Sequence, residues 1–166
     1  CIRDSYDLAL DNRDALAGDI YKNAENYYKS VFEHAGGSIS FYPDKNGAAP
    51  TAELYHRETR FISVQDVKEF CKKHGITENV FFISAFGITL GKYNFKKDAV
   101  FTTIYHGRND SRLSETVGML VKTLPVFCDF SGTAKDCLSG VQKQLIDSMN
   151  NDIYPFSQIS HEFDIK

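Results

Sequence analysis

One segment, from Thr77 to Leu90, constrains the fold more than any other part of the sequence. Its hydrophobic side chains would lie on nearly every side of a helix: Phe81, Phe82, Ile83, Ala85, Phe86, Ile88 and Leu90. A helix with this pattern is buried on most of its sides. Gly87 and Gly91 would let another element approach it closely, because they carry no side chain. The chain must therefore supply further elements that pack around this helix.

Three other segments carry helical signals. From about Asn12 to Ala35 the hydrophobic residues recur at three- and four-residue steps, which predicts an amphipathic helix. Ser63 is placed to cap a second helix, which Gly75 ends, and Thr77 is placed to cap the apolar helix described above. Thr133, with Asp136 three residues further on, is placed to cap a long helix near the end of the chain.

Strand signals are fewer and shorter. The continuous apolar run Ala99 to Tyr105 predicts a central strand, and Met119 to Phe127 predicts a second one, with Pro125 near its end or at an edge. Leu54 to Ile62 is more polar and predicts an edge strand. Helices and strands in this order indicate an α/β fold, a two-layer sandwich of a mixed sheet covered by helices.

The chain has 166 residues, a length that suits one domain. We expect a single domain over residues 1–166, with a leading helix within 1–36 and an α/β core and tail over 52–166. With 42% hydrophobic and 25% charged residues, the composition is that of a folded globular protein. No block of basic residues and no run of 18 apolar residues occurs, so we expect neither a nucleic-acid partner nor a membrane span.

The cysteines indicate reduced thiols in a cytoplasmic protein. None of the four, Cys1, Cys71, Cys128 and Cys137, forms a C-x-x-C pair, and no histidine lies at zinc-finger spacing. We therefore expect no metal site and no disulfide framework. The sequence also lacks the G-x-S-x-G, Walker, H-E-x-x-H and G-x-G-x-x-G motifs, which removes the commonest hydrolase and nucleotide-binding mechanisms from consideration.

Two stretches carry a family resemblance. His106-Gly107-Arg108, followed after a polar loop by residues 117–125, Val-Gly-Met-Leu-Val-Lys-Thr-Leu-Pro, resembles a signature of the condensation domains of nonribosomal peptide synthetases. Residues 151–156, Asn-Asp-Ile-Tyr-Pro-Phe, are similar to a later segment of the same family. Lys122 stands where the family pattern has Asn, and Leu120 stands where it has Phe.

The resemblance implies a fold and an activity. The family has the chloramphenicol acetyltransferase-like fold of CoA-dependent acyltransferases, in which two lobes face each other across a tunnel. It forms peptide bonds between thioesters carried on the phosphopantetheine arms of peptidyl carrier proteins, as in antibiotic biosynthesis. The implied substrates are these thioesters, and no cofactor is bound directly.

The catalytic motif of the family, His-His-x-x-x-Asp-Gly, is absent. The five histidines, His34, His56, His74, His106 and His161, include no adjacent pair. We therefore expect the chain to be an incomplete C-terminal lobe that is inactive alone, with no catalytic residue of its own. Its expected partners are the N-terminal lobe, peptidyl carrier proteins and, for the isolated chain, a second copy in a homodimer. The alternative is a non-catalytic docking or recruitment module of the same fold.

The resemblance also assigns site residues. Gly118, Lys122 and Thr123 are expected to line the substrate channel, although strand alternation allows at most one of Lys122 and Thr123 to point inward. Gly107 and Gly118 provide either clearance in the channel or ordinary turns.

The remaining site residues are expected to be structural. Arg108 is expected to order its loop through an ion pair, or to be a solvated loop charge. His106 has no acid or nucleophile beside it in the sequence, which favours an ordinary surface histidine over a catalytic one. In the later segment Asp152, Tyr154, Pro155 and Phe156 are expected to anchor the tail by packing and capping.

Overall fold

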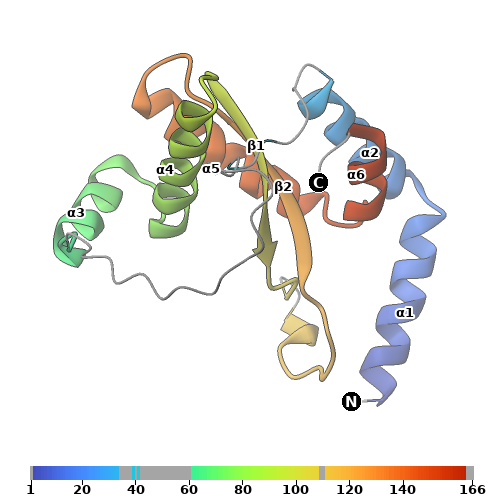
Figure 1. Cartoon of the computed structure of the whole chain (residues 1–166). Helices are drawn as coiled ribbons and strands as arrows, with labels where there is room; N and C mark the ends of the chain where they lie inside the picture. Colours follow the sequence, from blue (N-terminus) through green and yellow to red (C-terminus); the bar gives the residue numbers. More distant parts are fainter. Residues whose placement is uncertain (1, 34–38, 40, 42–60, 109–110, 164–166) are drawn as a thin grey trace, which may run out of the picture.

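The computed structural model of the chain describes residues 2–33, 39, 41, 61–108 and 111–163 (Figure 1). Over these ranges the helices are α1 (Ile2–Leu16), α2 (Asp19–Phe32), α3 (Val64–His74), α4 (Glu78–Tyr93), α5 (Ala134–Asn150) and α6 (Phe156–Phe163). The strands are β1 (Asp98–Tyr105) and β2 (Lys122–Asp129), and a short 3-10 helix, Ser111–Leu113, lies between them. Most of the edge strand expected over residues 54–62 falls outside the described residues, and Phe61 and Ile62 are in no strand.

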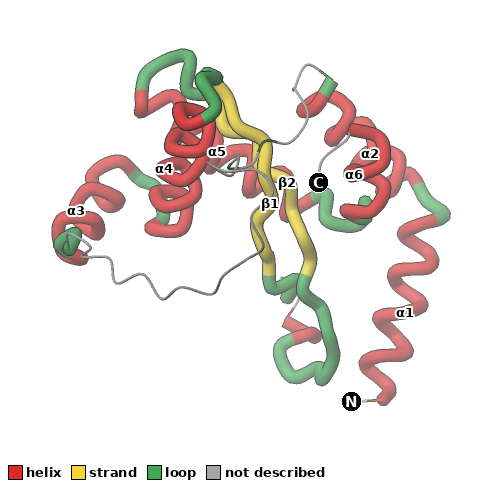
Figure 2. Tube along the Cα trace, viewed as in Figure 1, coloured by secondary structure: helices red, strands yellow, loops and turns green. Residues whose placement is uncertain are grey.

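The two strands pair antiparallel and lie between two groups of helices (Figures 1 and 2). Ala99 pairs with Cys128, and both contribute to a core cluster with α4 and α5. The next residue, Val100, points to the opposite face and packs in a second cluster with α2 and α6. Because successive side chains of a strand point to opposite faces, each strand contributes to both cores. The α/β class expected from the sequence is confirmed, with helices covering both faces of the sheet.

Helix α4 is less completely covered than its sequence predicts. Val80, Ile83 and Leu90 are buried in the core cluster shared with α5 and the sheet. Phe82 and Phe86, however, are 53% and 47% exposed, so the expectation that this helix is buried on most of its sides was wrong. Helices α3 and α5 and both strands contact α4, yet these two rings stay about half exposed. In the described part of the chain, no helix combines the length and apolarity needed to cross a membrane.

The N-terminal region forms two helices where the sequence predicts one. α1 and α2 are separated at Gly18, which has an extended backbone (φ −105°, ψ −178°) and precedes α2 as its N-cap. Leu16 and Ile20, which the periodicity places on the buried face, are 51% and 61% exposed. The buried face of α2 is instead made by Ala24, Tyr28 and Phe32, which are spaced four residues apart. The apolar spacing therefore continues past Gly18 and gives no sign that the helix is interrupted there.

The helix caps read from the sequence are all present. Ser63 and Thr77 each accept a hydrogen bond from the backbone N–H three residues further on, at 3.3 and 3.2 Å. Gly75 ends α3 in the left-handed conformation, with φ 65°. At the start of α5, Thr133 and Asp136 form a reciprocal capping box, in which each side chain accepts from the other residue's backbone N–H.

Strand β2 begins later than predicted, and Gln144 of α5 binds its outer edge. The strand starts at Lys122, and Met119, where the sequence predicts its start, is 92% exposed in the preceding loop. The backbone N–H of Phe127 donates to Gln144 Oε1 at 3.0 Å, and Gln144 Nε2 donates to the carbonyl of Pro125 at 3.1 Å. Pro125 is tolerated within this strand because a strand edge does not require its missing N–H.

Candidate functional site

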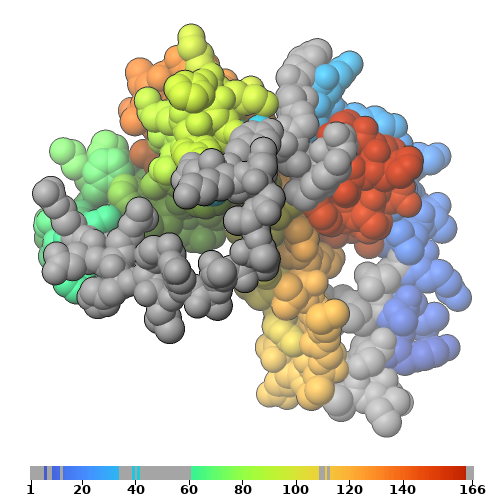
Figure 3. Space-filling view, in the orientation of Figure 1, coloured from blue at the N-terminus to red at the C-terminus, as the bar shows by residue number. Residues whose placement is uncertain are grey.

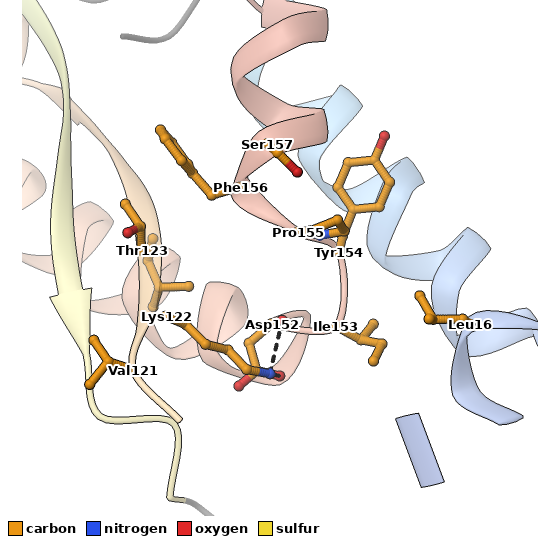
Figure 4. A pocket seen from close by; sticks show the side chains of 11 residues that line it. Leu16, Val121, Lys122, Thr123, Asp152, Ile153, Tyr154, Pro155, Phe156 and Ser157 are labelled. Atoms are coloured by element: carbon orange, nitrogen blue, oxygen red, sulfur yellow. Dashed lines mark hydrogen bonds and ion pairs between the residues drawn. The ribbon is translucent and has the colours of Figure 1, made fainter. Parts of the chain in front are cut away.

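A surface cavity of about 490 Å³ lies where the start of β2 meets the segment between α5 and α6 (Figure 4). Both stretches that resemble the condensation family contribute to its wall. Because they are far apart in the sequence, packing of the α5–α6 connection against β2 is what joins them. The lining residues are Leu16, Val121, Lys122, Thr123, Leu124, Asp152, Ile153, Tyr154, Pro155, Phe156 and Ser157.

Lys122 and Asp152 form the charged part of this wall. Lys122 Nζ lies 2.8 Å from Asp152 Oδ1 and donates a second hydrogen bond, of 3.1 Å, to the backbone carbonyl of Asp152 (Figure 4). The two side chains are 36% and 23% exposed, so water screens the pair partly. The pair fastens β2 to the α5–α6 connection. It also compensates the charge of Lys122, so the cavity contains an ion pair rather than an isolated cation.

Lys122 and Thr123 both line the cavity, although strand alternation predicts that at most one of them reaches it. In Figure 4 their side chains point in different directions, Lys122 toward Asp152 and Thr123 toward the side of Phe156. The side-chain directions therefore follow strand alternation, and both residues nevertheless border the cavity.

Gly118 is not among the residues that line this cavity. It is exposed, and a Cβ built at this position would meet nothing within 4 Å. Its φ lies outside the left-handed region, so the backbone gives no reason for a glycine here. The role of Gly118 in giving clearance to a channel remains a prediction.

Gly107 differs from Gly118 both in its backbone conformation and in the space around it. Its φ is 66°, in the region that side-chain-bearing residues rarely adopt, and a Cβ would overlap the carbonyl oxygen of Leu120. The local backbone and the close approach of the 118–121 segment therefore both require glycine. Of the two interpretations left open for Gly107, this geometry favours the turn.

Arg108 holds the loop between the strands together. Its guanidinium donates to the carbonyl oxygens of Leu113, Thr116 and Gly118, the last two at 2.9 and 3.3 Å. The sequence suggested a carboxylate partner, whereas the partners found in the described loop are backbone carbonyls. A planar donor with several N–H groups suits this task, because it can bind successive carbonyls at once. In Figure 3 this loop, coloured gold, projects beyond the body of the molecule.

The later segment is anchored by an aromatic side chain. Tyr154 is 4% exposed, and its ring lies 5.1 Å from that of Tyr21 and 6.0 Å from that of Tyr28, both on α2. Pro155 precedes α6, and Phe156 begins that helix while lining the cavity. Burial of Tyr154 positions the neighbouring Asp152 and Phe156 against β2.

Several lining residues were not expected from the sequence. Leu16 comes from α1, more than a hundred residues before the rest of the site, and its apolar spacing marked it for the core. Ile153 lies inside the segment that was singled out, so a search for apolar neighbours of the motif would have found it. The others are Val121, Leu124 and Ser157.

The described residues include no metal-binding cluster of three or more His, Cys, Asp or Glu side chains. His106 is exposed, and its Nδ1 accepts a hydrogen bond of 2.9 Å from the backbone N–H of Arg108. Its ring lies 4.7 Å from that of Tyr105. This histidine therefore takes part in the turn that precedes the loop. What the cavity provides is an apolar wall with one ion pair, which suits binding and positioning.

Comparison of the sequence with known protein families identifies a match. The family of condensation domains matches residues 5–166, which is nearly the whole chain, and the chain belongs to that family. The resemblance seen in the two short stretches therefore extends over both helical layers and the sheet between them.

Several curated proteins are similar in sequence. The nonribosomal peptide synthetase sidC of Arthroderma benhamiae is 28% identical over 135 residues, 80% of this chain and 3% of that protein. Bacitracin synthase 2 of Bacillus licheniformis is 24% identical over 93% of this chain and 6% of its own length. Surfactin synthase subunit 1 of Bacillus subtilis is 27% identical over 90% of this chain and 4% of its own length. The chain therefore spans a small part of each relative.

Solved structures share the fold. The SgcC5 protein of Streptomyces globisporus superposes with a TM-score of 0.75 at 19% identity, over 96% of this chain and 37% of that one. The first condensation domain of the calcium-dependent antibiotic synthetase superposes with a TM-score of 0.72 at 14% identity, over 93% of this chain and 35% of that one. The chain thus corresponds to rather more than a third of each of these structures.

Proposed function

We propose that this chain forms part of the C-terminal lobe of a condensation domain that joins carrier-bound aminoacyl or peptidyl thioesters. In this reaction the acceptor amine attacks the donor thioester carbonyl, an amide bond forms, and the donor carrier thiol leaves. The observation that carries the proposal is the meeting of the two family-like stretches at one cavity, in a chain that matches the family over residues 5–166. The cytoplasmic location expected from the cysteines belongs to the same proposal.

The chain's own contribution is positioning. The apolar side chains of the cavity wall offer a surface against which substrates can pack, and the Lys122–Asp152 pair holds β2 against the α5–α6 connection. Holding two reactants in a fixed geometry supplies much of the rate in a reaction of this type. The described residues that line the cavity include no histidine. We therefore assign proton transfer to a group of the N-terminal lobe.

The experiment is a condensation assay with loaded donor and acceptor carrier proteins. The isolated chain should give no turnover above background. In the complete condensation domain, Thr123→Leu should lower turnover at least tenfold, because it fills the cavity. Thr102→Leu is the matched control, since Thr102 lies on β1, is exposed and does not line the cavity. Equal turnover of the two variants would overturn the role of the cavity, and turnover by the isolated chain would overturn its assignment as an incomplete lobe.

The alternative function, a docking or recruitment module, finds less support, because the curated relatives are synthetases. The assay separates the two functions. A complete domain that binds carriers but never forms an amide would favour recruitment.

The exposed end of the hairpin is the proposed surface for the N-terminal lobe. Ile104, Val117, Met119 and Val121 are 77%, 77%, 92% and 55% exposed, and large apolar side chains exposed near one end of a hairpin are candidates for contact with another protein. In the isolated chain the same surface should pair with a second copy, because closed two-fold contacts are the commonest form of self-association. Sedimentation equilibrium should reveal a dimer that Met119→Lys weakens, and a monomer at all micromolar concentrations would overturn this part of the proposal.

A further inference from the structure

Two buried cysteines lie side by side between β2 and α5. The sulfur atoms of Cys128 and Cys137 are 3.3 Å apart, and the two residues are 0% and 2% exposed. Both are free thiols in the structure, as is Cys71 on α3. A short connection joins the strand to the helix, and the capping box at Thr133 and Asp136 holds the first turn of α5 in place. The two sulfurs therefore belong to elements that are already fixed against each other.

We propose that Cys128 and Cys137 are an oxidation site, at which a small peroxide converts the two thiols into an intramolecular disulfide. In the first step the thiolate of Cys137 attacks hydrogen peroxide, an S–O bond forms, the O–O bond breaks, and hydroxide leaves. In the second step the sulfur of Cys128 attacks the sulfenic sulfur, the S–S bond forms, and water leaves. Overall, two thiols and one hydrogen peroxide give one disulfide and two waters.

Access decides which thiol reacts first. A surface pocket of about 350 Å³ reaches Cys137, and its wall includes Asp136, Gly140 and Gln144, whereas Cys128 is not part of that wall. Small oxidants such as hydrogen peroxide fit a pocket of this size. Cys128 lies deeper, against Gly87 of α4. This arrangement makes Cys137 the attacking thiol and Cys128 the resolving one.

The electrostatics agree with this order. The hydrogen bond shared with the Cys128 thiol lowers the pKa of Cys137, although burial and the charge of Asp129 act in the opposite direction. The same hydrogen bond, together with burial, raises the pKa of Cys128. Cys137 also lies in the first turn of α5, where the positive end of the helix dipole stabilises a thiolate. Of the two thiols, the one that borders the pocket is therefore the one that ionises more readily.

Little movement is needed to form the bond. A disulfide requires a sulfur–sulfur distance of about 2.05 Å, so the sulfurs must approach by roughly 1.2 Å from their separation of 3.3 Å. Side-chain rotation can supply a shift of this size. The bond would link β2 to α5 and would leave the opposite end of β2, with Lys122 and Thr123, unaltered.

Peptide mapping tests the proposal directly, because trypsin separates the two cysteines. Cleavage after Lys122, Lys135 and Lys143 gives peptides 123–135 and 136–143, each with a single cysteine. The complete protein is treated with hydrogen peroxide, unfolded, alkylated and digested. We expect the two peptides to be joined, with the loss of two hydrogens, and to separate on reduction. Cys71, in peptide 69–72, is the internal control and should be found alkylated.

Variants distinguish the two roles. Cys128→Ser should abolish the linkage and leave a sulfenic acid on Cys137 that dimedone traps, whereas Cys71→Ser should leave the linkage unchanged. Full alkylation of Cys128 and Cys137 in the oxidised wild-type protein would overturn the proposal. Conversion of Cys137 to a sulfinic acid without linkage would overturn it as well. Because both results come from the wild-type protein, the test stands even if a serine variant fails to fold.

Discussion

Helix α4 lies so close to strand β2 that a Cβ built on Gly87 would be 2.7 Å from Cβ of Cys128 and 2.8 Å from its sulfur. Real Cβ atoms do not approach other atoms this closely, so the glycine sets the spacing between the helix and the sheet. The sequence pattern of α4 predicted such an approach without saying which element would make it.

Gly87→Ala should therefore destabilise the protein, by about 1–3 kcal/mol, because the added methyl group overpacks the core. Urea denaturation followed by circular dichroism measures this free energy of unfolding. The matched control is Gly140→Ala in α5, where a Cβ would meet nothing within 4 Å. That variant should be neutral or stabilising by up to about 1 kcal/mol, because alanine favours helix more than glycine does. Equal effects of the two substitutions would contradict the close approach.

Gly107 and Gly118 should respond differently to the same substitution. Gly107→Ala should cost about 2 kcal/mol or more, because it forces a side chain into a left-handed backbone against the carbonyl of Leu120. Gly118→Ala should leave the free energy of unfolding unchanged within about 0.5 kcal/mol. Chemical denaturation of both variants measures the difference. A large cost at Gly118 would mean that the loop packs more tightly than the structure describes.

The Lys122–Asp152 pair should contribute a coupling free energy of about 0.5–1 kcal/mol, as partly screened ion pairs do. A double-mutant cycle with Lys122→Met and Asp152→Asn measures it, and 1 M salt should reduce it. The cycle for the exposed pair Arg13–Asp14, whose side chains are 72% and 70% exposed, should show no measurable coupling. If the Lys122 cycle also gave zero, the ion pair would not fasten β2 to the α5–α6 connection.

Alkaline pH should destabilise the core between α2 and α5. Burial raises the pKa of Tyr27 to about 12, while its hydrogen bond with Ser148 opposes part of that shift. Burial also raises the pKa of Tyr28. A raised pKa means that the folded state favours the neutral phenol. This contribution to stability is complete below pH 10, the ordinary tyrosine value, and is lost as the pH rises through about 12.

The measurement is the free energy of unfolding between pH 9 and 12, with tyrosinate absorbance recorded in parallel. Tyr27→Phe should reduce the dependence on pH, and Tyr6→Phe, at a site that is 65% exposed, should not. A free energy that stays constant over this interval would show that the tyrosines ionise without opposing the fold.

Much of the fold was predictable because the signals are local. The caps at Ser63, Thr77 and Thr133 depend on hydrogen bonds between residues three apart, so the side chain and its partner stand together in the sequence. Two β-branched or aromatic runs likewise predicted β1 and β2, although β2 starts three residues later than expected. The break at Gly18 was missed, since the apolar spacing runs through it unchanged.

The sequence by itself therefore determined the helix boundaries that caps mark, the α/β class and the two stretches that identify the family. Only the tertiary structure decided that Asp152 compensates the charge of Lys122, thirty residues away, and that Leu16 lines the same cavity. It also decided that Gly107 needs its glycine for the turn and that Gly118 has open space around it. The physical reason is the sequence separation of the interacting residues. Hydrogen bonds within a turn join residues a few positions apart, so residue spacing predicts them, whereas contacts between distant segments depend on how the helical layers pack on the sheet.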